Sequence, residues 1–181
     1  MIGCVDVDYR DTGVTAACVG AEGWASELAR IEVVVRAPGR PAAYQPGAFY
    51  ERELPYLLEV LERMPPLELV IVDAYVWLGP DQPGLGKRLH DARGGIVVGV
   101  AKTRFAGAEA SGGGARVSGG ASQVIDVRRG DSDRPLHVTA VGMDPAAAAA
   151  HVAAMHGEFR IPTLLRRADA LARGHAPLSG R

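Results

Sequence analysis

Hydrophobic positions in the first part of the chain follow the two-residue period of β-strands. Residues 2–9, 14–20 and 30–36 are rich in valine and alternate apolar with polar side chains. A turn signal, Asp-Thr-Gly at residues 11–13, separates the first two of these segments. Strands joined by short links pair in antiparallel fashion, so the pattern predicts a three-stranded meander.

The period then changes from strands to a helix. From residue 47 to residue 64 the apolar side chains recur at helical spacing, with Phe49, Leu57 and Leu61 on one face. Pro55 has to lie in a first turn or at a kink, because its ring removes a backbone hydrogen bond. This segment is therefore predicted to form one helix after the meander.

Short, continuous apolar runs follow this helix and predict strands that are buried on both faces. A late strand and two further helices complete the chain, and Asp144 followed by proline is expected to cap the first of these helices. The predicted elements are strands at 67–73, 95–101 and 136–142, and helices at 83–92, 145–156 and about 163–173.

Two segments carry no periodic pattern. Residues 106–121 are rich in glycine and are predicted to form a mobile loop or an irregular hairpin. Residues 174–181 are predicted to be a flexible C-terminal tail. The remaining residues, 1–173, are expected to form a single domain, because no linker divides them.

Composition suits a soluble globular chain: 48% of the 181 residues are hydrophobic and 23% are charged. No apolar run reaches the roughly 20 residues that span a bilayer, so no membrane association is expected. Asp6 and Asp8 interrupt the N-terminal segment, which therefore does not resemble a signal peptide. We expect a cytoplasmic monomer.

Charge and cysteine content allow more than one interpretation. The net charge of −1 argues against a strongly basic nucleic-acid-binding protein. However, nearly all cations are arginines, which suit bidentate contacts with phosphate, and the pairs at 87–88, 128–129 and 166–167 could form a basic rim. Cys4 and Cys18 are expected to be buried hydrophobes, and a disulfide is conceivable if their strands pair.

Three acidic residues stand out because each lies within or at the end of an apolar segment. Asp6 lies on the first strand, Glu53 lies in the apolar stripe of the first long helix, and Asp73 ends a buried strand. Carboxylates are costly to desolvate without a partner. Three that converge would repel one another unless a divalent cation lay between them, and this predicts metal-assisted hydrolysis, most often of phosphate esters.

Each of these residues also has an ordinary explanation. Asp6 could be a surface residue of an edge strand, and Asp73 could cap the loop after its strand. Glu53 would lie at the surface if Pro55 rotated the first turn of its helix.

The predicted order of elements, β-β-β-α-β-α-β, is that of the ribonuclease H-like fold, an α/β fold with a mixed sheet flanked by helices. In that fold, acidic residues on the first strand, the first helix and the fourth strand build a metal site. Asp6, Glu53 and Asp73 occupy these three elements.

At these residues the chain resembles the endonuclease V family, the deoxyinosine-specific endonucleases. Most of residues 2–172 match family motifs in order. The matching segments are Val-Asp-Val at 5–7, Tyr-Gln-Pro-Gly at 44–47, Arg-Glu-Leu-Pro at 52–55, Val-Ile-Val-Asp at 70–73, Gly-Val-Ala-Lys at 99–102 and Pro-Leu-His-Val-Thr-Ala-Val-Gly at 135–142.

The resemblance implies roles for these residues. Asp6 and Asp73 would bind Mg²⁺, with Mn²⁺ as a substitute ion, and Glu53 would complete the site. Tyr44, with Pro46 and Gly47, would contact the substrate, the tyrosine ring stacking where a base leaves the helix. Lys102 would contact the substrate phosphate. A loop aromatic that rests on the domain and a plain strand-end lysine are the alternatives for Tyr44 and Lys102.

The chain also departs from the family pattern. The family has a histidine directly after the last Val-Gly, close to the metal site, where this chain has Met143. His137 is not expected to replace it, because six residues of extended strand place it about 20 Å away. The Gly-x-x-x-x-His-Pro-Arg segment after the second aspartate is also altered, at residues 74–81.

The sequence thus predicts a Mg²⁺-dependent endonuclease in DNA repair. Its substrate would be DNA, or RNA as a close variant, that contains a deaminated purine such as hypoxanthine. The alternative is a catalytically weak or inactive module of the same fold that binds nucleic acid or a protein partner.

Overall fold

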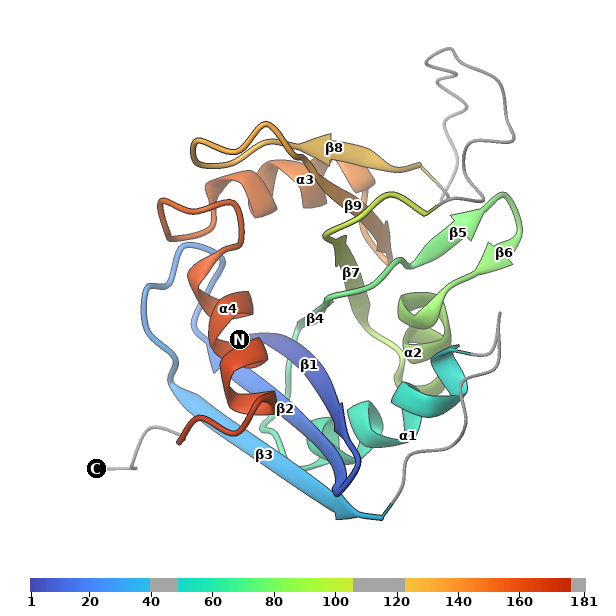
Figure 1. Ribbon diagram of the computed structural model, residues 1–181. Coiled ribbons are helices and arrows are strands. Elements are labelled where there is room, and N and C mark those ends of the chain that lie inside the picture. Colours follow the sequence, from blue (N-terminus) through green and yellow to red (C-terminus); the bar gives the residue numbers. More distant parts are fainter. Residues whose placement is uncertain (40–48, 106–122, 177–181) are drawn as a thin grey trace.

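A seven-stranded mixed sheet runs through the centre of the protein (Figure 1). The computed structural model describes residues 1–39, 49–105 and 123–176. The strands of this sheet are β1 (Ile2–Arg10), β2 (Gly13–Ala21), β3 (Ile31–Pro38), β4 (Leu69–Val72), β7 (Ile96–Ala101), β8 (Ile125–Val127) and β9 (Leu136–Val141).

The strand order is β3-β2-β1-β4-β7-β9-β8, and it combines both kinds of pairing. The first three strands form the predicted antiparallel meander. β4 and β7 then add in parallel to β1, as buried strands joined by helices do. β9 and β8 return in antiparallel fashion at the far edge.

Helices cover both faces of the sheet and make three layers (Figure 1). Two helices of the first half pack on one face, over Val5, Cys18 and Val70. Two helices of the second half pack on the other, over Cys4, Ile71 and Val98. The helices are α1 (Phe49–Glu62), α2 (Leu85–Arg93), α3 (Pro145–Ala154) and α4 (Thr163–Ala172).

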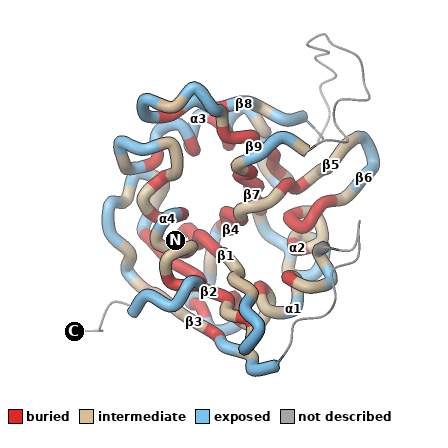
Figure 2. Tube along the Cα trace, viewed as in Figure 1, coloured by how far each residue is buried: buried red, intermediate tan, exposed pale blue. Residues whose placement is uncertain are grey.

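Alternation along β1 divides its side chains between the two cores, and Figure 2 shows the resulting buried centre. Cys4 belongs to the core under α3 and α4, whereas Cys18 belongs to the core under α1 and α2. Both thiols are free and buried, as expected for small hydrophobes. The conceivable disulfide between them is not formed.

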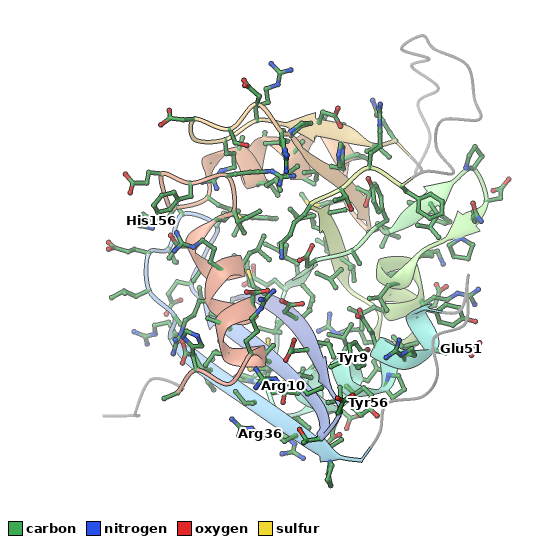
Figure 3. All side chains as sticks on the ribbon, viewed as in Figure 1. Tyr9, Arg10, Arg36, Glu51, Tyr56 and His156 are labelled. Atoms are coloured by element: carbon green, nitrogen blue, oxygen red, sulfur yellow. The ribbon has the colours of Figure 1, made fainter. Side chains whose placement is uncertain are left out.

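Pro55 lies inside α1 without ending it. Glu53 nevertheless remains on the buried side, with 9% of its surface exposed, and Leu57 one turn later is fully buried. The alternative in which Pro55 turns Glu53 to the surface is therefore wrong. Glu51 on the same helix points outward (Figure 3).

The structure contains short strands that the sequence pattern did not predict. β5 (Trp77–Gly79) and β6 (Gln82–Pro83) form a small hairpin after β4, and Asp81 in its turn has a positive φ of 55°. Asp tolerates this conformation better than most residues. β8 is the other unpredicted strand, and all three are too short to show a period.

The structure describes none of the predicted loop and only the first three residues of the predicted tail. Residues 106–121 lie outside the described residues, so that prediction is untested. Residues 174–176 are hydrogen-bonded to α4: the amides of Gly174 and His175 donate to Leu171 and Ala170, and Ala176 accepts from Arg167. In the described parts of the chain, no helix has the length and apolar character needed to cross a membrane.

Candidate active site

Asp6 and Asp73 lie side by side at the point where β4 leaves the sheet. The parallel register pairs Val5 with Val72, and the residue that follows each of them is an aspartate. Both carboxylates line one small cavity between the sheet and α4, together with Lys102 and Ile161. The sheet therefore brings together two of the predicted acidic residues that are 67 positions apart.

Glu53 approaches the same point from α1. Burial and the charges of Asp6 and Asp73 raise the pKa of Glu53 from its ordinary value of 4.5 to about 8. The charges of Asp6 and Asp73 thus reach Glu53, so the three carboxyl groups lie within electrostatic range of one another.

Asp169 on α4 is a fourth acidic residue at this site, and our sequence analysis did not single it out. One of its carboxylate oxygens lies 3.9 Å from the ammonium of Lys102, and the other lies 3.0 Å from Nε of Arg173. Its charge also acts on Asp6. α4 packs across β1 and β2 and thereby carries this side chain to the carboxylates (Figure 1).

Lys102 follows the last residue of β7 and is the cation of the cluster. Its Nζ lies 2.5 Å from Oδ2 of Asp73. Partial burial by itself lowers the pKa of Lys102, but the hydrogen bond to Asp73 and the charges of Asp73, Asp6 and Asp169 outweigh it, and the net shift is upward. Lys102 therefore stays charged at neutral pH and cannot serve as a general base.

Asp6 shows the same crowding of negative charge. Burial, followed by the charge of Asp73, raises the pKa of Asp6 from 3.8 to about 7, although the amide of Val7 donates to its Oδ1 at 2.9 Å. Two cations, Lys102 beside Asp73 and Arg173 beside Asp169, do not balance four acidic side chains. A divalent cation would relieve the excess charge.

The donor set suits a hard cation, because all four acidic side chains offer oxygen ligands of the kind that Mg²⁺ and Mn²⁺ prefer. As the side chains stand, no three His, Cys, Asp or Glu residues within the described ranges are grouped closely enough to form a ready metal site. Lys102 lies against Asp73 instead. The residues therefore fit the ion in chemistry and charge, and binding would require the side chains to rearrange.

A groove adjoins the cluster on the side of the β5–β6 hairpin. Its volume is about 890 Å³, and Asp73 and Lys102 form the end that it shares with the carboxylates. Aromatic and basic side chains line much of the remainder, among them Tyr50, Tyr75, Phe105, Arg88 and Arg104. Such a groove offers stacking surfaces for bases and cations for phosphates.

Met143 and this cluster lie at opposite ends of the strands. β9 runs antiparallel to β7, so Val141 pairs with Val97 near the start of β7, whereas Lys102 follows the end of β7. Met143 packs against the core under α3 and α4, and Asp144 caps α3 by accepting from the amide of Ala147 at 2.8 Å. The expectation that position 143 lies close to the metal site is therefore wrong for this chain.

His137, which we had excluded by its distance from Met143, lies at the other end of β9. It pairs with Ala101, directly before Lys102. His137 is therefore far from position 143, as expected, but it lies at the end of β9 that is near Lys102.

Replacing Met143 by histidine is expected to leave cleavage within about twofold of the wild-type rate, because position 143 and the carboxylates lie at opposite ends of the strands. A cleavage time course for the Met143→His variant tests this. A gain or loss of tenfold or more would mean that position 143 communicates with the site after all.

The predicted basic rim is only partly available for binding. Arg129 is buried and donates to backbone carbonyls around α3, including those of Ala153 and Gly157. Arg167 holds both carboxylate oxygens of Glu32, at 2.6 and 2.8 Å. Tyr44, Pro46 and Gly47 lie outside the described residues, so their predicted substrate contacts are untested.

A meander, two parallel strands and an aspartate directly after the last β1–β4 pair on each strand define a ribonuclease H-like nuclease fold. Within this class the chain belongs to the Endonuclease V family, whose model matches residues 1–170. The predicted fold and the resemblance are thereby confirmed.

Known members support this assignment. The Endonuclease V of Streptomyces avermitilis is 34% identical over 93% of this chain and 77% of its own length. Its crystal structure superposes with a TM-score of 0.75 at 30% identity and covers 95% of this chain and 79% of that one. The Ciona intestinalis Endonuclease V has been solved in complex with a 24mer DNA that contains an inosine followed by a ribo-adenosine. It shares the fold at 17% identity, with a TM-score of 0.72 over 95% of this chain and 83% of that one.

Proposed function

We propose that this protein is a metal-dependent endonuclease that hydrolyses phosphodiester bonds in nucleic acid near deaminated purines. The observation that carries the proposal is the cavity at the end of β4 that Asp6, Asp73 and Lys102 line together, with Glu53 within range of the charges of both aspartates. Membership of the Endonuclease V family and the inosine-containing DNA bound by the Ciona relative support the substrate class.

Asp6 and Asp73 would hold the ion, with Glu53 completing the site and Mg²⁺ as the ion, or Mn²⁺ in its place. When bound, the ion supplies an activated water and neutralises charge on the leaving oxygen. The residues of the chain exclude water from one side, because the cavity around the two aspartates is lined by Val100, Leu136 and Leu165.

Lys102 would place positive charge against a phosphate oxygen once the ion binds Asp73. An ammonium beside a phosphate anion stays charged, because the ordinary pKa of lysine is far above neutral, so Lys102 would act as an electrostatic partner of the phosphate rather than as a base. The aromatic groove on the other side of Asp73 would receive the base, which costs a few kcal/mol to extrude from a duplex and less from a single strand. RNA is therefore a substrate to test beside DNA.

Matched oligonucleotides, with and without one hypoxanthine, test the proposal in Mg²⁺, in Mn²⁺ and in a chelator. We expect cleavage of the strand that contains hypoxanthine and not of the matched strand, and we expect it only when the ion is present. The products would carry a 3′-hydroxyl and a 5′-phosphate. Tight binding without cleavage at high protein concentration would support the inactive module instead. Met143 gives that alternative no support, because the residue is remote from the site.

Removing the Asp169 carboxylate is expected to lower the rate of cleavage by about 10²-fold, because the fourth charge of the cluster and its contact with Lys102 are lost. The Asp169→Asn variant keeps the shape of the side chain, and single-turnover kinetics measure the change. Arg173→Lys serves as the control, since it retains a cation beside residue 169. A rate for Asp169→Asn within threefold of wild type would show that Asp169 belongs to the helix surface alone.

A further inference from the structure

The segment that follows β7 joins the carboxylates to the groove. Lys102 holds Asp73, and the next three residues, Thr103, Arg104 and Phe105, line the groove wall. This segment lies beyond the last paired residue of β7, Ala101, so the strand ladder does not hold it. Something else must fix its path if Lys102 is to keep its place.

Tyr75 supplies two backbone contacts to this segment. Its hydroxyl donates to the carbonyl of Thr103 at 3.1 Å and accepts from the amide of Phe105 at 3.3 Å. Tyr75 follows Asp73 by two residues and is 9% exposed. One hydroxyl thus pairs with both the carbonyl of Thr103 and the amide of Phe105, which lie beyond the strand ladder. Without it, each of these groups would bind water or stay unpaired.

The tyrosine ring is itself held on two sides. It stacks on His137 with the ring centres 6.3 Å apart and the planes 16° apart, and Phe105 lies against it at 6.4 Å. His137 is 6% exposed, and its Nδ1 lies 2.7 Å from Oδ1 of Asp126 on β8. The hydroxyl therefore projects from a ring that cannot turn freely.

The side of the segment nearer the strand has its own anchor. Arg160, in the loop before α4, donates to the carbonyl of Lys102 and, at 2.7 Å, to that of Pro135. Lys102 is thus held at its own carbonyl by Arg160, and the residues after it are held by Tyr75. Tyr75 fixes the part of the segment that faces the groove.

We propose that Tyr75 is a positioning residue: its hydroxyl holds Thr103 and Phe105, and through them it places Lys102 for the substrate phosphate. This proposal rests on the proposed function for its effect on cleavage. Catalytic groups need placement within a fraction of an ångström, so loosening the segment is expected to impair the reaction without touching the carboxylates.

The Tyr75→Phe variant removes only the hydroxyl and keeps the ring. We expect kcat/KM for a hypoxanthine-containing strand to fall about 10- to 30-fold, as the loss of one or two hydrogen bonds predicts. Tyr56→Phe is the matched control, because Tyr56 lies beside Tyr9 (Figure 3) and is not among the residues that line the groove, and it should change kcat/KM less than twofold.

A double-mutant cycle with Lys102→Met tests whether Tyr75 acts through the lysine. If it does, Tyr75→Phe costs less than about threefold in the Lys102→Met background, because the group that it places is already gone. The same 10- to 30-fold loss in both backgrounds, or full activity of Tyr75→Phe alone, would overturn the proposal.

Amide hydrogen exchange separates this proposal from the proposed function, because it needs no cleavage. Tyr75→Phe should speed exchange of the Phe105 amide at least about tenfold while the amide of Val98, within β7, keeps its protection. Unchanged exchange at Phe105 would refute the positioning role even in an active enzyme. Faster exchange in a protein that cleaves nothing would keep the structural role of Tyr75 and refute the nuclease.

Discussion

Replacing Asp73 by asparagine lowers the rate of cleavage by about 10³-fold or more. The substitution keeps the shape of the side chain but removes a charge that lies beside Asp6 and holds Lys102 at 2.5 Å. The oxygen that remains is a weaker ligand for Mg²⁺, and Lys102 loses its partner. The weaker ligand reduces metal binding, and the loss of its partner displaces the lysine that would contact the phosphate.

Single-turnover cleavage of a hypoxanthine-containing strand, over a range of Mg²⁺ concentrations, measures this effect. Asp91→Asn removes the same charge from the exposed surface of α2 and should stay within twofold of wild type. An Asp73→Asn variant that retains a tenth of the wild-type rate would remove Asp73 from the metal site.

The second large effect concerns stability: the free energy of unfolding is expected to fall, rather than rise, as pH increases from acid to neutral. In the metal-free protein the pKa values of Asp6 and Glu53 rise on folding, to about 7 and about 8. The folded state therefore binds more protons than the unfolded state between about pH 4 and pH 8, and the free energy of unfolding falls as pH rises through that window.

Urea unfolding in a chelator, from pH 4.5 to pH 8.5, measures this dependence for wild type, Glu53→Gln and Glu51→Gln. Glu53→Gln should gain about 1–2 kcal/mol over wild type at pH 8.5 and little at pH 4.5, because the buried charge is absent. Glu51→Gln, on the outer side of α1, should show no such pH-dependent gain. Adding Mg²⁺ at pH 8.5 should stabilise the wild type more than Glu53→Gln.

An equal difference between wild type and Glu53→Gln at both pH values would mean that Glu53 is not in a crowded, buried cluster. A gain for Glu51→Gln equal to that for Glu53→Gln would point to the net charge of the helix instead.

The pattern of the sequence predicted the strands and the acidic cluster because each is encoded locally. Val-rich runs suit buried central strands, and on both β1 and β4 an aspartate directly follows the last residue that pairs the two strands. Glu53 was found because it interrupts an apolar helical stripe. These signals need no knowledge of distant contacts.

Asp169 was missed although the same signal was present. It lies four residues after Leu165 and three before Ala172, both buried, so its carboxylate faces the sheet as Glu53 does. The arginines at 166, 167 and 173 made this helix resemble an ordinary charged surface. Spacing from the buried positions, rather than the number of neighbouring charges, would have identified it.

Met143 was misplaced for a different reason. The pattern of residues 136–142 predicts a strand but not its direction, and position 143 lies near the carboxylates only if β9 runs parallel to β7. The antiparallel pairing of Val141 with Val97 places it at the other edge. Direction is set by contacts distant in sequence, and the two- and three-residue strands β5, β6 and β8 were missed because such short segments show no period.

Crystals soaked in Mn²⁺ test the central claim most directly, because the anomalous signal of the ion locates it independently of any assay. We predict a peak in contact with carboxylate oxygens of both Asp6 and Asp73, at about 2.0–2.3 Å, with Lys102 displaced from Asp73. A peak elsewhere on the protein, or none at saturating Mn²⁺ with Lys102 still on Asp73, would contradict a metal-dependent nuclease at this edge of the sheet.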